Sequence, residues 1–215
     1  MTKVAIIGAG AHTRSSINLL LNYFNSDDIR IYDDSFVKGE QEMISSIPLI
    51  GCINDIELEQ DVFLSIGNND LRKKYFLKFK DKIIRNTIFH SDSLQEKDVI
   101  FGIANQVFAH SYINSQVVIG DNNIINTGAI IEHEAIVGNH NHISIGAKIC
   151  GRSAIGNICL IGAGAVVVDK ISICDNVIIG AGSVVIRDIK VAGTYVGNPA
   201  KRIKWYIFLL HVLNT

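Results

Sequence analysis

Apolar and polar residues alternate with two different periods along this chain. Between residues 1 and 95, short apolar runs rich in β-branched side chains alternate with segments in which apolar residues recur at helical spacing. The first kind of run is typical of buried strands, and the second is typical of amphipathic helices. From Phe101 onward, both periods give way to a period of six. The chain is therefore predicted to contain two domains of different construction.

The first domain, residues 1–95, is predicted to be a small Rossmann-like α/β unit with a parallel sheet. Its first strand, VAIIG, is wholly apolar, as expected of a strand that is buried on both faces. The predicted strands are residues 4–8, 28–34, 62–67 and 82–89, and the predicted helices are residues 11–24 and 69–82. Because a helix follows the first and the third strand, we expect parallel pairing.

The second domain, residues 96–196, is predicted to be a parallel β-helix of hexapeptide repeats. Sixteen apolar residues in succession are spaced six residues apart, and small residues such as Ala129 and Ala147 often stand four positions later. A period of six does not fit an α-helical turn, and the segment is rich in glycine, asparagine and β-branched residues. Each six-residue unit is expected to form one side of a triangular coil of 18 residues around a shared core. The repeat residues are Phe101, Val107, Ile113, Ile119, Ile125, Ile131, Val137, Ile143, Ile149, Ile155, Ile161, Val167, Ile173, Ile179, Val185 and Val191.

The remaining segment, residues 197–215, begins with GNPAKRIK and ends in an almost wholly apolar stretch, WYIFLLHVL at 205–213. Pro199 is expected to end the repeat in an exit turn with a basic flank. The apolar stretch is long enough for only about two and a half helical turns. We expect it to form a short helix or strand packed on a neighbouring subunit rather than a membrane contact.

Composition and charge narrow the class of protein. The chain has 20 Lys and Arg residues against 21 Asp and Glu residues, so it lacks the basic excess that would indicate a nucleic-acid partner. No segment approaches the roughly 20 apolar residues of a membrane-spanning helix, and the apolar run at the N-terminus is too short for a secretory signal. The four cysteines share no C-x-x-C spacing and are expected to be reduced thiols. We therefore expect a soluble, cytoplasmic protein with no membrane span.

Ionisable residues gather inside the regular repeat, in EHEAIVGNHNH at 132–142. His133 lies two residues after a core position and is expected at a corner, facing outward. Gly151, 18 residues later, should stack over it and leave space beside the ring and an approachable backbone N–H. Imidazole suits the role of a proton acceptor at neutral pH, although an exposed histidine is also often a solvated surface residue. Either Glu132 or Glu134 could orient the ring, and the spacing alone does not decide between them.

His142 and His140 lie half a coil further on. His142 belongs to a different side of the triangle from His133, so the two could meet only across a subunit interface. A structural hydrogen bond is the alternative role for His142, and His140 is expected to be a solvated corner residue. The three histidines could also be metal ligands, which we consider the weaker alternative.

Residues typical of a phosphate site follow the first strand. GAGAH at 8–12 opens the first helix, where glycines permit close backbone approach and unpaired N–H groups face an anion. Thr13 stands in the place of the third glycine of a dinucleotide fingerprint. Asp33 and Asp34 end the second strand, where they could bind nucleoside hydroxyls or base N–H groups, or could simply form a turn.

An isoleucine-led hexapeptide of this composition resembles the hexapeptide-repeat acyltransferases, which form trimers of left-handed β-helices. The motifs GAGAHTR, IYDD, IGNND, NTGAIIEHEAIVG, HISIGAKICG and VGNPAKRIK look like those of the sugar acetyltransferases that include the PglD-type UDP-4-amino-sugar N-acetyltransferases and the NeuD-type sialic acid O-acetyltransferases. IYDD and IGNND look most like the nucleotide-sugar N-acetyltransferases of bacillosamine synthesis. One departure is that Ala11 and Thr13 stand where close relatives carry the glycines of GxxGHG.

This resemblance implies roles for individual residues. It implies that His133 is the catalytic base and that Glu134 raises its basicity. The implied acetyl-CoA contacts are His142, Gly151, Ala163, Ala181, Pro199 and Lys201. The implied contacts to the UDP-amino-sugar are Gly10, His12, Asp33, Asp34, Gly67 and Asn68. The resemblance implies no metal, and it implies a homotrimer with active sites between subunits.

The predicted function is acetyl transfer from acetyl-CoA to the 4-amino group of a UDP-4-amino-4,6-dideoxy sugar in a glycan pathway. Direct transfer is expected because no cysteine or serine stands beside His133 as a covalent nucleophile. Two alternatives stay open at this point. One is a sugar O-acetyltransferase of the sialic acid type, and the other is a non-catalytic trimer that binds nucleotide sugars.

Overall fold

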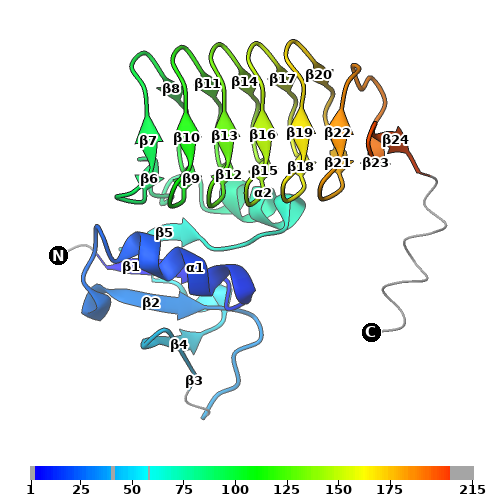
Figure 1. The fold of residues 1–215 in the computed structure, drawn as a ribbon. Coiled ribbons are helices and arrows are strands. Elements are labelled where there is room, and N and C mark those ends of the chain that lie inside the picture. The colour runs from blue at the N-terminus through cyan, green and yellow to red at the C-terminus, as the bar shows by residue number, and fades with distance from the viewer. Residues whose placement is uncertain (1–2, 40–41, 58, 204–215) are drawn as a thin grey trace.

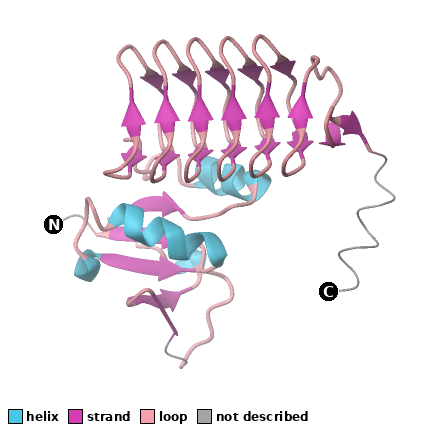
Figure 2. Ribbon diagram, in the orientation of Figure 1, coloured by secondary structure: helices cyan, strands magenta, loops and turns pink. Residues whose placement is uncertain are grey.

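The computed structural model describes residues 3–39, 42–57 and 59–203. In Figure 1, a row of stacked coils lies above a small α/β domain, and helix α2 (Asn69–Lys78) lies between them. Figure 2 shows that the helices belong to the α/β part, whereas the coils consist of short strands and turns. The two predicted domains of different construction are confirmed.

Five strands form the sheet of the α/β domain, in the order β3-β4-β2-β1-β5. All neighbours run parallel except β3 and β4, which form an antiparallel hairpin. Helix α1 packs on one face of the sheet through Ile17 and Leu20, and α2 packs on the other through Tyr75 and Phe76. The bounds are β1 Val4–Ile7, α1 Ala11–Leu20, β2 Ile29–Tyr32, β3 Glu42–Ile44, β4 Ile47–Gly51 and β5 Asp61–Leu64, with 3-10 helices at Ser26–Asp28 and Ile53–Asp55.

Two predictions for this domain need correction. The strand predicted at 82–89 is not a strand of this sheet, because only Ile83 forms a bridge, to Val62, while Ile88 and Phe89 pair with the β-helix. The hairpin of β3 and β4 was not predicted. Its strands are short, and its turn is made by Ser45 and Ser46, which both have positive φ.

The second domain is a parallel β-helix with three sheets, and strands that pair within a coil stack lie 18 residues apart, as in Ile124 with His142. The β12 sheet contains β6 Ile88–Phe89, β9 Gln106–Val107, β12 Ile124–Ile125, β15 His142–Ile143, β18 Leu160–Ile161, β21 Val177–Ile179, β23 Gly193–Val196 and β24 Lys201–Arg202. The β13 sheet contains β7 Leu94–Gln95, β10 Tyr112–Ile113, β13 Ile130–Ile131, β16 Lys148–Ile149, β19 Val166–Val167 and β22 Val184–Val185. The β14 sheet contains β8 Ile100–Phe101, β11 Val118–Ile119, β14 Ile136–Val137, β17 Ala154–Ile155 and β20 Ser172–Ile173. Since β6 and β7 belong to these sheets, the β-helix begins before the predicted boundary at residue 96.

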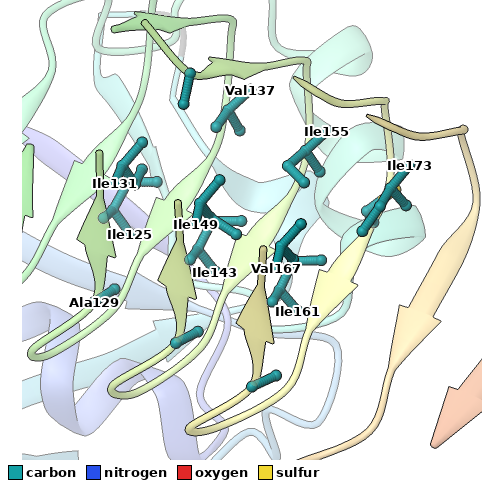
Figure 3. Packing of buried hydrophobic residues seen from close by; sticks show 14 of the residues in the cluster. Ile125, Ala129, Ile131, Val137, Ile143, Ile149, Ile155, Ile161, Val167 and Ile173 are labelled. Carbon is teal, nitrogen blue, oxygen red and sulfur yellow. The ribbon is translucent and has the colours of Figure 1, made fainter. Parts of the chain in front are cut away.

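The side chains of the repeat point into the interior of the coils, as Figure 3 shows for Ile131, Ile149 and Val167 in one row. Small residues such as Ala129 and Ala147 are fully buried between them. The last position of the predicted repeat is wrong, because Val191 is 53% exposed and Ile189 is buried instead. Ile189 bridges Ile173, which shortens the final coil by two residues.

Three edges join the sheets, and each edge carries a different chemistry. Every sixth residue along the turns has a φ near +60°, so one turn residue per side adopts the left-handed conformation. Between the β12 and β13 sheets this residue is Gly128, Gly146, Gly164 or Gly182 in successive coils, and we call this the glycine edge. The edge between the β13 and β14 sheets contains His133 and Glu134, and we call it the histidine edge. The third edge, which contains Asn122, His140 and Ile158, faces α2, and we call it the docked edge.

Helix α2 holds the two domains together at the docked edge. Asn69 donates from its side-chain amide to the Cys159 carbonyl at 2.9 Å, and the Phe76 ring meets the His140 ring edge-on at 5.2 Å between centroids. His140 is only 9% exposed. The expectation that His140 is a solvated corner residue is therefore wrong, because α2 covers its corner.

No helix in the described part of the chain is long and apolar enough to cross a bilayer. The apolar stretch 205–213 lies outside the described residues, so its predicted packing stays a prediction.

Candidate active site

A cavity of about 450 Å³ opens where β1, β2 and β5 end and α1 and α2 begin. The carboxyl ends of parallel strands are the usual ligand site of such a sheet. Of the residues predicted to bind the nucleotide sugar, Gly10, His12, Asp33, Asp34 and Gly67 line this cavity. Asn68 does not. Its side chain accepts from the Leu71 N–H at 2.9 Å and caps α2.

The cavity is suited to an anion although no lysine or arginine is among its lining residues. Helix α1 begins at its wall with Gly10 as the N-cap, and no side chain caps this end. A helix N-terminus presents unpaired N–H groups and a partial positive charge, which favours a phosphate. A Cβ on Gly10 would meet nothing within 4 Å, so the backbone there is open to a ligand.

The two carboxylates of the cavity have different roles. Asp33 accepts from the backbone N–H groups of Ala9 and Ser35 at 2.8 and 2.9 Å, which ties the loop after β1 to the end of β2. Burial would raise the pKa of Asp33, but these bonds outweigh it and lower the pKa. Asp34 accepts more loosely, from the Ile53 N–H at 3.2 Å and the Tyr75 hydroxyl at 3.4 Å. Asp34 therefore has more capacity left to accept a hydrogen bond from a ligand.

The ring of His12, at the wall of this cavity, lies near the ring of His142, which is not itself among the lining residues. Their ring centroids are 6.0 Å apart, and His12 Nε2 lies 3.3 Å from Gln106 Oε1. His142 projects from β15, and its Nε2 lies 3.1 Å from Asn126 Nδ2. Because Asn126 Oδ1 already accepts from the Thr127 N–H, its amide must donate to the His142 ring. His142 Nε2 is therefore an acceptor, and the ring proton lies on Nδ1.

Both imidazoles are neutral at physiological pH. Burial lowers the pKa of His142 to about 4, with a further contribution from the Arg72 charge, and a hydrogen bond to the Gly67 backbone only partly opposes this. Burial also lowers the pKa of His12 to about 4. A neutral imidazole can both donate and accept a hydrogen bond, and neither ring adds a charge to this region.

His133 has a different environment, in the turn that joins β13 to β14. Its Nδ1 lies 3.0 Å from Glu134 Oε2, and the two side chains are 44% and 51% exposed. Glu132, the other neighbouring carboxylate, instead accepts from the Asn114 side chain at 2.6 Å. With Glu134 on Nδ1, the free lone pair of His133 is on Nε2, as a general base requires.

Gly151 lies against the His133 ring. A Cβ at this position would be 2.7 Å from His133 Nε2 and 2.8 Å from its Cε1, so only glycine lets the ring lie there. The Arg152 N–H donates to the His133 carbonyl at 2.9 Å, which is the predicted stacking of one coil on the next. The Gly151 N–H meets no acceptor within the described part of the chain.

The α/β domain matches the sequence model of the PglD N-terminal domain family over residues 3–79. The acetyltransferase domain of PglB from Neisseria gonorrhoeae FA1090 matches nearly the whole chain, with a TM-score of 0.85, 28% identity and coverage of 94% of this chain and 100% of that one. The chain has the architecture of a PglD-type sugar acetyltransferase. The resemblance drawn from the sequence motifs is thereby confirmed.

Two further solved structures that this chain matches contain bound ligands. A histidine-to-asparagine variant of perosamine N-acetyltransferase from Caulobacter crescentus, in complex with CoA and GDP-perosamine, has a TM-score of 0.86 and 28% identity, covering 95% of this chain and 98% of that one. The PglB domain in complex with acetyl coenzyme A has a TM-score of 0.83 and 29% identity, covering 94% and 98%. No curated protein sequence matches.

The remaining residues predicted to bind acetyl-CoA fall in two places. Ala163 and Ala181 lie one above the other on the glycine edge, where the Gly182 N–H donates to the Ala163 carbonyl at 2.8 Å. Pro199 and Lys201 line a cavity of about 240 Å³ at the C-terminal end of the β-helix, together with Arg187. Neither place adjoins the cavity that contains His12 in the same chain, since the lining residues do not overlap.

His133 and His142 are not brought together within one chain. His142 projects from the β12 sheet, which faces the α/β domain, whereas the turn between β13 and β14 lies along the opposite edge of the coils (Figure 1). A side of a triangle and the opposite vertex cannot contribute to one cavity. The structure agrees here with the expectation from the half-coil spacing.

Sequence reasoning missed several residues of the site. Tyr75, Leu71 and Ile53 line the cavity beside His12, and Asn126 fixes the His142 ring. Arg72 is also new, as a fully buried cation. One signal was available, because Arg72 shares the buried face of α2 with Tyr75 and Phe76, where a charge is out of place.

The alternative of a metal site gains no support, since no three histidine, cysteine or acidic side chains in the described residues are placed to hold an ion.

Proposed function

We propose that this chain transfers the acetyl group of acetyl-CoA to the 4-amino group of a UDP-linked 4-amino-4,6-dideoxy sugar, as a homotrimer in the cytoplasm. The amine nitrogen attacks the thioester carbonyl while His133 Nε2 takes one of its protons. The tetrahedral intermediate collapses with release of the thiolate, which takes the proton back from His133 and leaves as coenzyme A. No covalent enzyme intermediate is needed.

The observation that carries this proposal is the arrangement around His133. Glu134 binds one ring nitrogen, and Gly151 leaves space beside the other. A base must be reachable by the proton that it takes, and this ring is half exposed on the outside of the coils. The unpaired N–H of Gly151 is available to the thioester oxygen, whose negative charge grows during attack.

The trimer is supported by the incompleteness of the site in one chain. The nucleotide cavity, with His12 and His142, faces away from the His133 of the same chain. A neighbouring copy would bring its histidine edge to this cavity. Exposed apolar side chains on the β14 sheet, Ile100, Val118 and Ile136, offer a surface that such a neighbour could cover.

The path proposed for acetyl-CoA runs along the β-helix. On the glycine edge, Gly164 and Gly182 have open space where a Cβ would be, so the narrow pantetheine arm can lie close to the backbone. Arg187 and Lys201 in the C-terminal cavity carry the positive charge that coenzyme A phosphates favour.

The solved structures support the same assignment at a coarser level. One is a perosamine N-acetyltransferase with CoA and a GDP-sugar, and another is a PglB domain with acetyl coenzyme A. They support nucleotide-sugar N-acetylation and acetyl-CoA as its donor. UDP and the 4-amino-4,6-dideoxy sugar are our own choice, from the IYDD and IGNND motifs. The four free cysteines fit a reducing cytoplasm.

The test is to incubate the purified protein with acetyl-CoA and a UDP-4-amino-4,6-dideoxy sugar, and to follow coenzyme A release and the mass of the sugar. GDP-perosamine serves as the competing substrate. A sugar heavier by one acetyl group confirms the reaction, and the ratio of kcat/KM values for the two substrates identifies the nucleotide. No transfer to either amine would contradict the proposal.

His133→Ala tests the base, with His110→Ala as the matched control, because His110 is an exposed histidine on a different edge. We expect kcat to fall by about two to four orders of magnitude in the first variant and to stay near the parent value in the second. Equal rates in parent and His133→Ala would remove His133 from the mechanism.

A further inference from the structure

Arg72 is a buried cation without an anionic partner among the residues that the structure describes. Its side chain is 0% exposed, and the guanidinium donates six hydrogen bonds at 2.8 to 3.3 Å. The acceptors are the carbonyl oxygens of Ile66, Gly67, Asn122, His140 and Asn141 and the side-chain oxygen of Asn69. None of them is a carboxylate, although an ion buried to this extent is usually paired.

These bonds connect the wall of the nucleotide cavity to the β-helix. Ile66 and Gly67 line the cavity at the end of β5. Asn141 directly precedes His142, and its carbonyl accepts from Arg72 Nη2 at 2.9 Å. Gly67 is bonded both to Arg72 Nη1 and, through its backbone, to the His142 ring. One guanidinium therefore fixes the distance between the cavity wall and the coil that carries His142.

The charge of Arg72 has an effect that packing alone would not give. Burial lowers the pKa of Arg72 to about 9, so the group is still cationic at neutral pH. After burial itself, this cation is the largest influence that lowers the pKa of His142 and of His140. It also acts on His12. A buried apolar side chain of similar volume would fill the space without desolvating a charge.

We propose that Arg72 is the positioning residue of the sugar site, which clamps Gly67 to the coil of His142 so that the sugar end of the substrate meets His12 and a neutral His142 in one arrangement. The inference rests on the proposed function of this cavity. Arg72 touches neither the substrate nor the reacting atoms, and it acts through Gly67 and His142. The rigid fork of the guanidinium suits this role because it reaches carbonyls from two domains at once.

The test compares Arg72→Gln and Arg72→Lys with the parent in the acetyl-transfer assay. Arg72→Gln removes the charge and most of the donors, whereas Arg72→Lys keeps the charge but not the fork. Arg85→Gln is the matched control, because Arg85 is exposed and lines neither cavity. A misplaced substrate loses rate more than affinity, so we expect kcat to fall about tenfold to a hundredfold in Arg72→Gln. KM for the nucleotide sugar should change less than kcat.

The pH dependence separates positioning from simple loss of stability. Without the cation, the pKa of His142 and of His12 should rise, so the acid side of the kcat profile of Arg72→Gln should move to higher pH. In Arg72→Lys the profile should keep its position while kcat is still reduced. NMR titration of the histidine rings, assigned with His12→Asn and His142→Asn, reads the same shift without any turnover.

Each outcome decides the inference. A folded Arg72→Gln protein with the kcat and the histidine titrations of the parent would overturn it. If Arg72→Gln does not fold, an Arg72→Lys protein with the kcat of the parent would overturn the clamp. If the parent itself fails to acetylate the amine, the proposed function is wrong, and unchanged His142 signals in the folded Arg72 variants would then overturn the role of Arg72 separately.

Discussion

His133 and His142 are two histidines that lie half a coil apart on the same repeat, yet their neighbouring residues give them different environments. His133 is half exposed, and Glu134 occupies its Nδ1 and leaves Nε2 as a free acceptor. His142 is covered by the α/β domain, and Asn126 occupies its Nε2 and leaves the proton on Nδ1. The repeat sets where each ring lies, and a single hydrogen-bond partner sets which nitrogen can act. In the proposed mechanism, one residue type thus supplies both the base and a neutral positioning group.

The largest effect is expected when the two rings are inactivated in different chains. We expect His133→Ala and His142→Asn proteins to be nearly inactive alone. Co-refolded in equal amounts, they should recover about a quarter of the parent rate, because random assembly gives that share of interfaces with both rings intact. Mixtures of each variant with itself are the control. A mixture that stays inactive would show that one active site does not combine His133 of one copy with His142 of another.

The next largest effect should come from the residue beside His133. Gly151→Ala places a methyl group 2.7 Å from His133 Nε2, so the ring must turn away from its position. We expect kcat to fall about a hundredfold with little change in the melting temperature. Ser115→Ala, at the same corner position in the coil that precedes the coil of His133, should leave the rate unchanged. Parent-like kinetics in Gly151→Ala would mean that the orientation of the His133 ring is not needed.

The two carboxylates that flank His133 offer a smaller and more selective test. Glu134→Gln keeps the shape of the side chain but removes the charge that holds the ring, and we expect kcat to fall about tenfold. Glu132→Gln should leave kcat near the parent value, since Glu132 bonds to Asn114 instead. The reverse order of the two effects would assign the orienting role to Glu132.

The smallest effect concerns the stability of the buried rings. His12, His140 and His142 have pKa values of about 4 when folded, below the ordinary histidine pKa of 6.5. Between these values the unfolded chain binds more protons, so stability is fully present above pH 6.5 and falls as the pH drops towards 4. Each group contributes at most about 1.4 kcal/mol per pH unit.

Urea unfolding between pH 7 and pH 5 measures this slope. His140→Asn should flatten this slope, because it removes one titrating ring. Asparagine also tolerates the left-handed conformation of that corner, so the variant should keep the fold. His110→Asn should not change it, since His110 is exposed. Asp33, with its lowered pKa, contributes only at lower pH. A slope that is the same in His140→Asn and in the parent would contradict the buried, neutral state of His140.

The β-helix and the His133 corner could be predicted from the sequence because both depend on local spacing. A core residue at every sixth position fixes the 18-residue stacking, which in turn places Gly151 against His133. A strand, a glycine turn and two aspartates, all of them also local signals, pointed to residues that line one cavity.

What the spacing could not predict depends on how the domains pack. His140 is buried only because Phe76 of α2 covers it, and Arg72 has its acceptors on segments far apart in the sequence. The choice of Glu134 over Glu132 depends on Asn114, which lies one coil away from Glu132. The shortened last coil follows from Asp188, whose side chain binds the Ser172 N–H and draws Ile189 into the core position.

The 18-residue stacking also limits how the chain can change in length. Inserting or deleting six residues between His133 and Gly151 would turn every later corner by one edge, and Gly151 would then no longer stack on His133. A whole coil could be added after Val167 without disturbing the edge residues that precede it. Such an addition would move the cavity of Arg187 and Lys201 further from His133 along the β-helix by one strand spacing, about 4.8 Å. The number of coils between His133 and the C-terminal cavity therefore sets the length of a ligand that spans the two, and the proposed cofactor, acetyl-CoA, has a fixed length.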